Sequence, residues 1–127
     1  MGYSEIEEVF CLTDDRKYKA FFNIAAESEI ICGLKAKEKW ITVKDENGNP
    51  SMPIWPGYGF AKYCQENQWK DTQIEGIDLY EFLEYWLSGM KRDGCSVLVL
   101  ADTAGGGIAV EADKFKEELE KYLSSEF

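Results

Sequence analysis

The segment at residues 77–100 constrains the fold more than any other part of the chain, because it marks a helix and a buried strand with clear boundaries. Asp78 is placed to cap this helix by accepting hydrogen bonds from the first backbone N–H groups, and Glu81 follows at the spacing of a capping box. Apolar residues then recur with the 3.6-residue period of a helix, at Leu79, Phe82, Leu83, Trp86, Leu87 and Met90. We expect this stripe to face the core.

The C-terminal end of this helix is marked as well, and a strand follows it. Lys91 and Arg92 put positive charge beside the last carbonyl groups, and Gly94 can adopt the left-handed conformation that ends a helix. Residues 97–100 (VLVL) are an uninterrupted apolar run of strand-forming residues. This run predicts a central strand that is covered on both faces.

The rest of the chain alternates between helical and extended patterns. Further helices are predicted at residues 4–12, from Thr13 onward, at residues 58–68 and at residues 112–124. Further strands are predicted at residues 30–34, 39–43, 73–76 and 108–110, with another that ends near Ile54 and Trp55. Strands joined sometimes by hairpins and sometimes by helices are typical of the α+β class. We therefore expect a mixed, mainly antiparallel sheet with helices packed against it.

Glycine, asparagine and proline mark the places where strands turn or end. Asn47-Gly48 is a strong hairpin signal. Pro53 and Pro56 flank a strand end and indicate an edge position, because proline cannot donate a hydrogen bond to a sheet. The glycines at residues 105–107 lead into an extended segment and not into a helix, so they predict a hairpin instead of a phosphate-binding loop.

The length of the chain, 127 residues with 45% hydrophobic content, suits one independent core, so we expect a single domain over residues 1–127. No apolar stretch approaches the roughly 20 residues that a membrane-spanning helix needs. The N-terminal sequence MGYSEIEEVF is acidic, whereas a secretory signal is basic and then apolar. These features predict a soluble, cytoplasmic protein.

The acidic balance of the chain bears on its partners. It has 24 acidic and 14 basic residues and a formal net charge of −10. Such a charge argues against binding to nucleic acid, which usually needs a clustered basic surface. It favours encounter with a basic protein, and it is equally what keeps many proteins soluble.

The residue types needed for common catalytic and metal sites are largely missing. The chain has no histidine, so the usual serine and cysteine triads and dyads lack their base. Its four cysteines are scattered singly, and we expect reduced, largely buried thiols with no bound metal or cofactor. The carboxylate pairs Glu81/Glu84 and Glu117/Glu120 fall on exposed helix faces, where we expect solvated surface charges and not acid–base catalysts. No catalytic residue is assigned.

Several segments together resemble DUF2750, an uncharacterised bacterial family. They are ICGL at residues 31–34, PIWPGYGFAKYC at residues 53–64, Trp69, the segment at residues 77–99, and a glycine-containing hairpin before the last helix. The resemblance covers most of the chain beyond Tyr18. It supports the fold class and implies no catalytic residue.

The segment at residues 53–60, here called the corner, is the best candidate for a functional surface. It combines two prolines, two glycines and three aromatic residues at a predicted strand-to-helix junction. A rigid corner that carries aromatic side chains suits a partner or a ligand, whereas the alternative is a plug that covers the sheet edge. The candidate surface consists of Trp55, Tyr58, Phe60, Tyr63 and Asp78.

Two functions follow from these observations. The preferred one is a small, acidic, non-enzymatic interaction module that holds a protein partner, possible roles being immunity or regulation against a basic protein. The alternative is a small-ligand-binding protein or enzyme with a pocket between the corner and the helix at residues 77–90, lined by Tyr58, Tyr63 or Asp78. An edge strand near Trp55 would also allow a homodimer.

Overall fold

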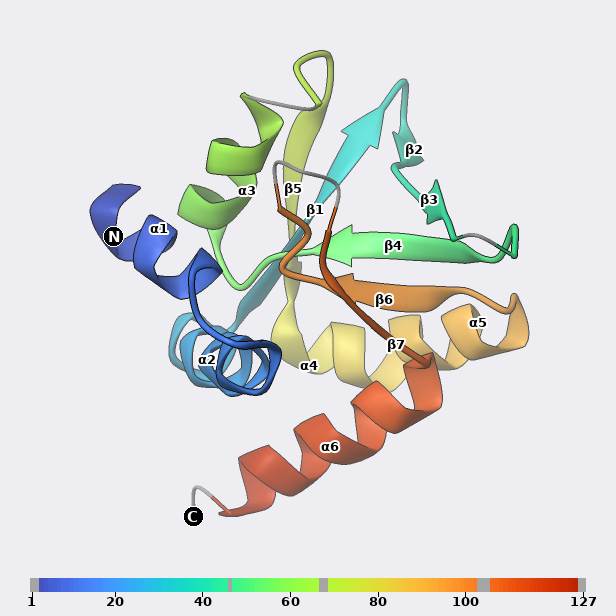
Figure 1. Ribbon diagram of the computed structural model, residues 1–127. Coiled ribbons are helices and arrows are strands. Elements are labelled where there is room, and N and C mark those ends of the chain that lie inside the picture. Colours follow the sequence, from blue (N-terminus) through green and yellow to red (C-terminus); the bar gives the residue numbers. More distant parts are fainter. Residues whose placement is uncertain (1–2, 46, 67–68, 103–105, 126–127) are drawn as a thin grey trace.

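The computed structural model describes residues 3–45, 47–66, 69–102 and 106–125, and it confirms the α+β class (Figure 1). The N-terminal half contains α1 (Tyr3–Phe10), α2 (Asp14–Ser28), β1 (Ile30–Ala36), β2 (Lys39–Trp40), β3 (Val43–Lys44), β4 (Pro50–Ile54) and α3 (Tyr58–Gln65). The C-terminal half contains β5 (Gln73–Asp78), α4 (Leu79–Glu81), η1 (Phe82–Trp86), α5 (Leu87–Arg92), β6 (Ser96–Val99), β7 (Ile108–Val110) and α6 (Ala112–Ser125). Of the predicted glycine turn at residues 105–107, Gly105 lies outside the described residues, while β6 and β7 form the expected hairpin.

The strands form two sheets where one was expected. Sheet A has the order β2-β1-β5, and sheet B has the order β3-β4-β6-β7. Neighbouring strands are antiparallel except for β4 and β6, which run parallel. In Figure 1 the strands of sheet B run across those of sheet A. The position of β6 between β4 and β7 confirms the central strand predicted at residues 97–100.

The single strand predicted at residues 39–43 is wrong, because the chain passes from one sheet to the other within it. β2 pairs with β1 in sheet A, and β3 pairs with β4 in sheet B. Lys37 and Glu38 both have positive φ angles and make the tight turn that returns β2 along β1. The turn after β3 is as predicted, with Gly48 at a φ of 82°.

The edge position predicted for Pro53 is also wrong, since β4 lies inside sheet B. The Ile54 carbonyl accepts from Leu100 N–H at 3.0 Å, whereas the backbone of Trp55 bonds to β1. The backbone groups of successive strand residues point toward opposite neighbouring strands. The backbone of Pro53, like that of Trp55, therefore points away from β6. On that side β3 pairs only with Pro50 and Ser51. The missing N–H of Pro53 therefore breaks no bond of the sheet.

The two sheets are joined at one residue pair, Cys32 and Trp55. Cys32 N–H donates to the Trp55 carbonyl at 2.8 Å, and Trp55 N–H donates to the Cys32 carbonyl at 2.9 Å. The indole Nε1–H of Trp55 donates to the Ala101 carbonyl at 3.0 Å, just beyond β6. The Cys64 thiol donates to the same carbonyl at 3.1 Å. Trp55 thus connects sheet A, sheet B and α3.

The helix predicted after Asp78 is present, and its N-cap is confirmed. The Asp78 carboxylate accepts from the backbone N–H groups of Tyr80 at 3.1 Å and Glu81 at 3.2 Å. One turn, η1, is a π-helix, in which Leu87 N–H donates to the Phe82 carbonyl five residues back. This wider turn leaves Trp86 half-buried, with its ring 4.8 Å from that of Trp40, while the rest of the predicted stripe is buried.

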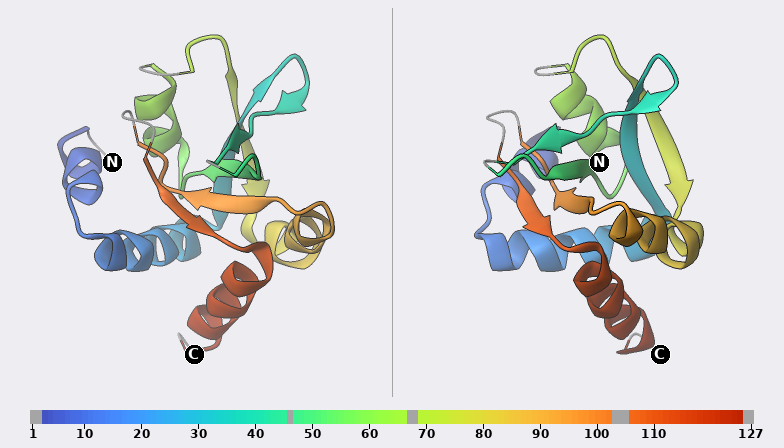
Figure 2. Two further views of the ribbon diagram at one scale, coloured as in Figure 1. Left: turned by 45° about the vertical axis from the view of Figure 1, so that its right-hand side comes forward. Right: turned by 90° about the vertical axis from the view of Figure 1, so that its right-hand side faces the viewer.

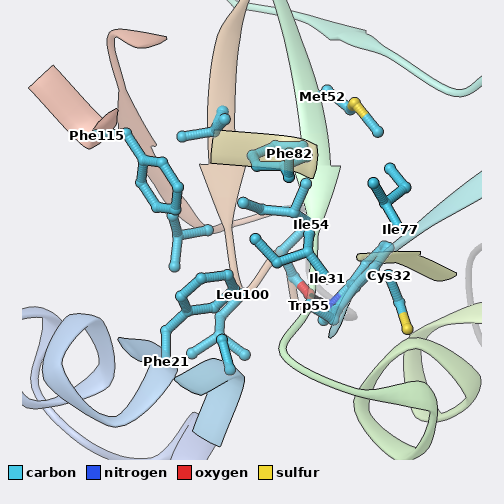
Figure 3. Close-up of a cluster of buried hydrophobic side chains, with 14 of the residues drawn as sticks. Phe21, Ile31, Cys32, Met52, Ile54, Trp55, Ile77, Phe82, Leu100 and Phe115 are labelled. Atoms are coloured by element: carbon cyan, nitrogen blue, oxygen red, sulfur yellow. Dashed lines mark hydrogen bonds between the residues drawn. The ribbon is translucent and has the colours of Figure 1, made fainter. Parts of the chain in front are cut away.

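Three phenylalanines pack the helices over sheet B. Phe21 comes from α2, Phe82 from η1 and Phe115 from α6, and each is fully buried. The ring of Phe115 lies 5.9 Å from that of Phe21 and 6.3 Å from that of Phe82. Figure 3 shows them around Ile54 and Leu100. These rings hold α2, the helix after β5 and α6 in one core.

Replacing Trp55 by phenylalanine should cost about 2–4 kcal/mol of unfolding free energy, since it removes the bond to Ala101 and leaves a cavity. Trp69→Phe is the matched control, because Trp69 is half-buried and its ring packs 5.8 Å from that of Trp55. Urea denaturation of both variants measures the difference. Equal losses of stability would contradict the role assigned to Trp55.

Candidate functional site

The structure divides the five residues of the predicted surface. Trp55 is 0% exposed and Phe60 is 2% exposed, so both belong to the core. Placing them on a partner surface was wrong, because the corner turns inward at the joint between the sheets. The alternative interpretation, a plug over the sheet edge, agrees with the burial of Trp55 and Phe60, but the strand before them is not an edge strand.

The remaining three predicted residues reach the surface to different extents. Tyr58, in the first turn of α3, is 54% exposed. Asp78 is exposed and caps the helix after β5. Tyr63 is half-buried, and its ring stacks on that of Phe10 in α1 at 5.7 Å. Tyr58 and Asp78 are therefore the exposed members of the set, whereas Tyr63 fastens α1 to α3.

Tyr58 lies against β5, close to Asp78. A Cβ atom added at Gly76 would lie 2.6 Å from the Tyr58 hydroxyl oxygen and would clash with the side chain of Ile30. Gly76 therefore lets Tyr58 lie directly over the strand, two residues before Asp78. Tyr58 and Asp78 therefore both lie along β5, although not around the pocket that was expected there.

β5 is an edge strand, and its pairing shows which backbone groups face outward. Gly76 lies opposite Cys32 of β1, and Ile74 lies opposite Leu34. Because the backbone of Cys32 bonds to Trp55 on the other side of β1, Cys32 and Gly76 form a pair without mutual hydrogen bonds. The N–H and C=O groups of Ile74 and Gly76 consequently point away from β1, toward the free edge.

The free edge of β5 lies at the margin of the molecule. In the right-hand view of Figure 2, β5 forms one side of the fold and no other element is drawn beyond it. The strand carries two exposed acidic residues, Glu75 and Asp78, and no basic residue. Proteins commonly protect such edges with lysine, proline or a bulge. The described residues of β5 show none of these features.

The sequence pattern does not reveal this edge. A short strand is predicted at residues 73–76, but strand order is not visible in the pattern of one segment. A second exposed aromatic residue, Tyr80 at 45% exposure, begins the helix directly after Asp78. Its position off the apolar stripe was the available signal that it faces water.

Five surface pockets of the described residues were compared with the one expected between the corner and the helix after β5, and none of these five corresponds to it. Tyr58, Tyr63 and Asp78 line none of these five. One of them, of about 440 Å³, contains an ion pair between Lys91 and Asp113 at 3.3 Å. The hydrogen bond from Lys91 lowers the pKa of Asp113. A carboxyl group held ionised in this way is unsuited to act as a general acid.

The edge strand expected near Trp55 does not exist, since β4 lies inside sheet B. The homodimer suggested for that place therefore has no free edge to use there. The free edges of the two sheets are formed by other strands, β5 and β7 among them.

The cysteines differ in burial. Cys32 and Cys64 are buried, and burial raises the pKa of each thiol to about 12. Cys95 is half-buried, and Cys11 is exposed, contrary to the expectation of largely buried thiols. Within the described ranges, no group of three or more cysteine or acidic side chains is arranged to hold a metal ion. No helix of the described residues is long and apolar enough to cross a membrane.

Iodoacetamide at pH 8 should alkylate Cys11 in the folded protein and leave Cys32 and Cys64 unmodified, because these two are inaccessible and remain protonated. Both should react at the rate of Cys11 once urea unfolds the chain. Mass spectrometry of the peptides reads each site. Rapid labelling of Cys64 before unfolding would contradict its burial against Ala101.

Comparison with known proteins supports the resemblance seen in the sequence. A search of curated proteins gave no match. The family described as "Protein of unknown function (DUF2750)" matches residues 18–119. This range runs from α2 to α6 and includes both sheets, the corner and the β5 edge. The chain belongs to the DUF2750 family.

Proposed function

We propose that this chain is a small, non-enzymatic, cytoplasmic interaction module that binds an extended segment of a partner protein at the free edge of β5, beside Tyr58. The observation that carries the proposal is the outward direction of the Ile74 and Gly76 backbone groups on a six-residue edge strand. Addition of a strand to an exposed sheet edge is a recurrent mode of peptide recognition.

The backbone of β5 supplies the directional part of this interaction. An added strand would lie about 4.8 Å from β5, with its N–H and C=O groups facing those of Ile74 and Gly76. It would extend sheet A from three strands to four, in the order β2-β1-β5-partner. Such bonds fix the direction and register of the partner segment, whichever side chains it carries.

Tyr58 supplies a side-chain contact at the middle of this edge. It is 54% exposed, and its hydroxyl lies over Gly76, where β5 itself has no side chain. A partner residue opposite Gly76 would pack on the exposed part of this ring. Tyrosine is one of the residues that most often dominate the binding energy of an interface.

The charge of the site favours a basic partner. Glu75 and Asp78 are exposed on β5, and the whole chain carries a formal charge of −10. Lysine or arginine in the partner segment would therefore bind more favourably than acidic residues, and long-range attraction would speed the encounter. Immunity against, or regulation of, a basic protein is a function that fits this charge. The small-ligand alternative lacks a comparable observation, because Tyr58 and Asp78 lie on a surface and line none of the five pockets.

Tyr58→Ala and Ile74→Pro should each abolish or strongly weaken capture of the partner from an extract of the source cells. The first change removes the aromatic contact, and the second removes an outward N–H that makes no bond to β1. Quantitative mass spectrometry of the captured proteins measures the effect.

Tyr85→Ala is the matched control, because Tyr85 is an exposed tyrosine on η1, outside β5. It should leave capture unchanged, and circular dichroism should show all three variants folded. The proposed site would be refuted if Tyr85→Ala lost the partner while Tyr58→Ala and Ile74→Pro still captured it.

A further inference from the structure

The opposite free edge of the fold, β7, borders a groove that the function proposed above does not use. The groove has a volume of about 590 Å³, and three elements line it. Its lining residues are Asp14, Asp15 and Tyr18 from α2, Ile108, Ala109 and Val110 from β7, and Glu111, Lys114 and Glu118 from α6 and the residue before it. In the right-hand view of Figure 2, β7 and β5 lie on opposite sides of the molecule.

Ala109 presents its backbone at the free edge beside this groove. The Leu100 N–H, just after β6, donates to the Ile54 carbonyl of β4. Backbone groups alternate in direction along a strand, so those of Val97 and Val99 point the other way, toward β7. Val97 pairs with Val110 and Val99 with Ile108, which leaves the intervening Ala109 facing away from β6. Ala109 is exposed, and β7 is the last strand of sheet B. Its N–H and C=O groups therefore point away from β6, at the free edge that borders the groove.

The walls of the groove are held together by a bond between α2 and α6. The Tyr18 hydroxyl donates to the Glu118 carboxylate at 3.0 Å. Burial, and then the charge of Glu118, raises the pKa of Tyr18. The hydroxyl therefore remains a hydrogen-bond donor even at alkaline pH, and its bond to Glu118 links α2 to α6 beside β7.

The charge of the lining selects the occupant. Asp14, Asp15, Glu111 and Glu118 are four carboxylates, and Lys114 is the one basic residue in the lining. A second copy of this chain, itself at −10, would be repelled, and so would nucleic acid. Alternate side chains of a strand share a face. A strand that carries lysine or arginine on one face can therefore pair with the carboxylates while its backbone forms hydrogen bonds with β7.

We propose that this groove is a second docking site, which binds an extended basic peptide segment by pairing with β7 and placing alternate lysine or arginine side chains against the acids of α2 and α6. It is independent of the β5 site, because the two edges belong to different sheets. One partner with two basic segments, or two partners, can therefore occupy the molecule at once.

The test uses the full chain and three capped octapeptides: alternating Lys-Val, alternating Glu-Val and alternating Lys-Pro. Lys-Pro matches the charge of Lys-Val but cannot pair as a strand. In a ¹⁵N-NMR titration, Lys-Val should shift the amide signals around Ala109 saturably. Its affinity should exceed that of Lys-Pro by at least about tenfold, and Glu-Val should not bind.

Two edge variants separate this site from the one on β5. Ala109→Pro removes an N–H that faces away from β6, and it should weaken Lys-Val binding at the β7 signals by about tenfold or more. Ile74→Pro is the control and should leave those signals and that affinity unchanged. The double variant Asp14→Asn/Asp15→Asn should weaken binding of the Lys-Val peptide, while the peptide still shifts the same amide signals around Ala109.

Equal affinity for Lys-Val and Lys-Pro would overturn the proposal, because charge alone would then account for binding. Saturable shifts confined to β5 would overturn it as well. Either result leaves the β5 proposal to be judged by its own variants.

Discussion

The arrangement of the whole molecule depends on Trp55. Its backbone pairs with Cys32 of sheet A, and its indole bonds to the Ala101 carbonyl at the end of β6 in sheet B. A residue fully buried between two sheets sets how they cross and where the chain leaves the core. The chain leaves Trp55 directly into α3, and this exit places Tyr58 over Gly76. The burial of Trp55 between the two sheets thus also positions the exposed Tyr58 over β5.

Local features of the fold could be predicted from the sequence. The Asp78 cap, the apolar stripe behind it and the turn at Gly48 are each encoded by neighbouring residues, and the structure contains all three. Features that depend on distant pairing could not be predicted. The division into two sheets and the interior position of β4 are set by contacts between segments far apart in the chain. The π-turn in η1 inserts one residue into a pattern that otherwise fits an ordinary helix.

The candidate site shows the same limit. An aromatic residue at a predicted corner can point inward or outward, and the sequence does not say which. Trp55 and Phe60 point inward, whereas Tyr58 points outward, although all three lie within six residues. The two free edges are similarly invisible, because an edge is a property of strand order. Once the order is known, alternation along β5 and β7 identifies Ile74, Gly76 and Ala109 as the outward-facing positions.

Amide hydrogen exchange tests the central claim most directly, because it reports individual backbone groups of β5. In the free protein, the Ile74 and Gly76 amides should exchange rapidly and the Glu75 and Ile77 amides slowly, since only the latter pair face β1. Binding of the captured partner should slow exchange at Ile74 and Gly76. Unchanged exchange at both residues in a saturated complex would contradict strand addition at this edge.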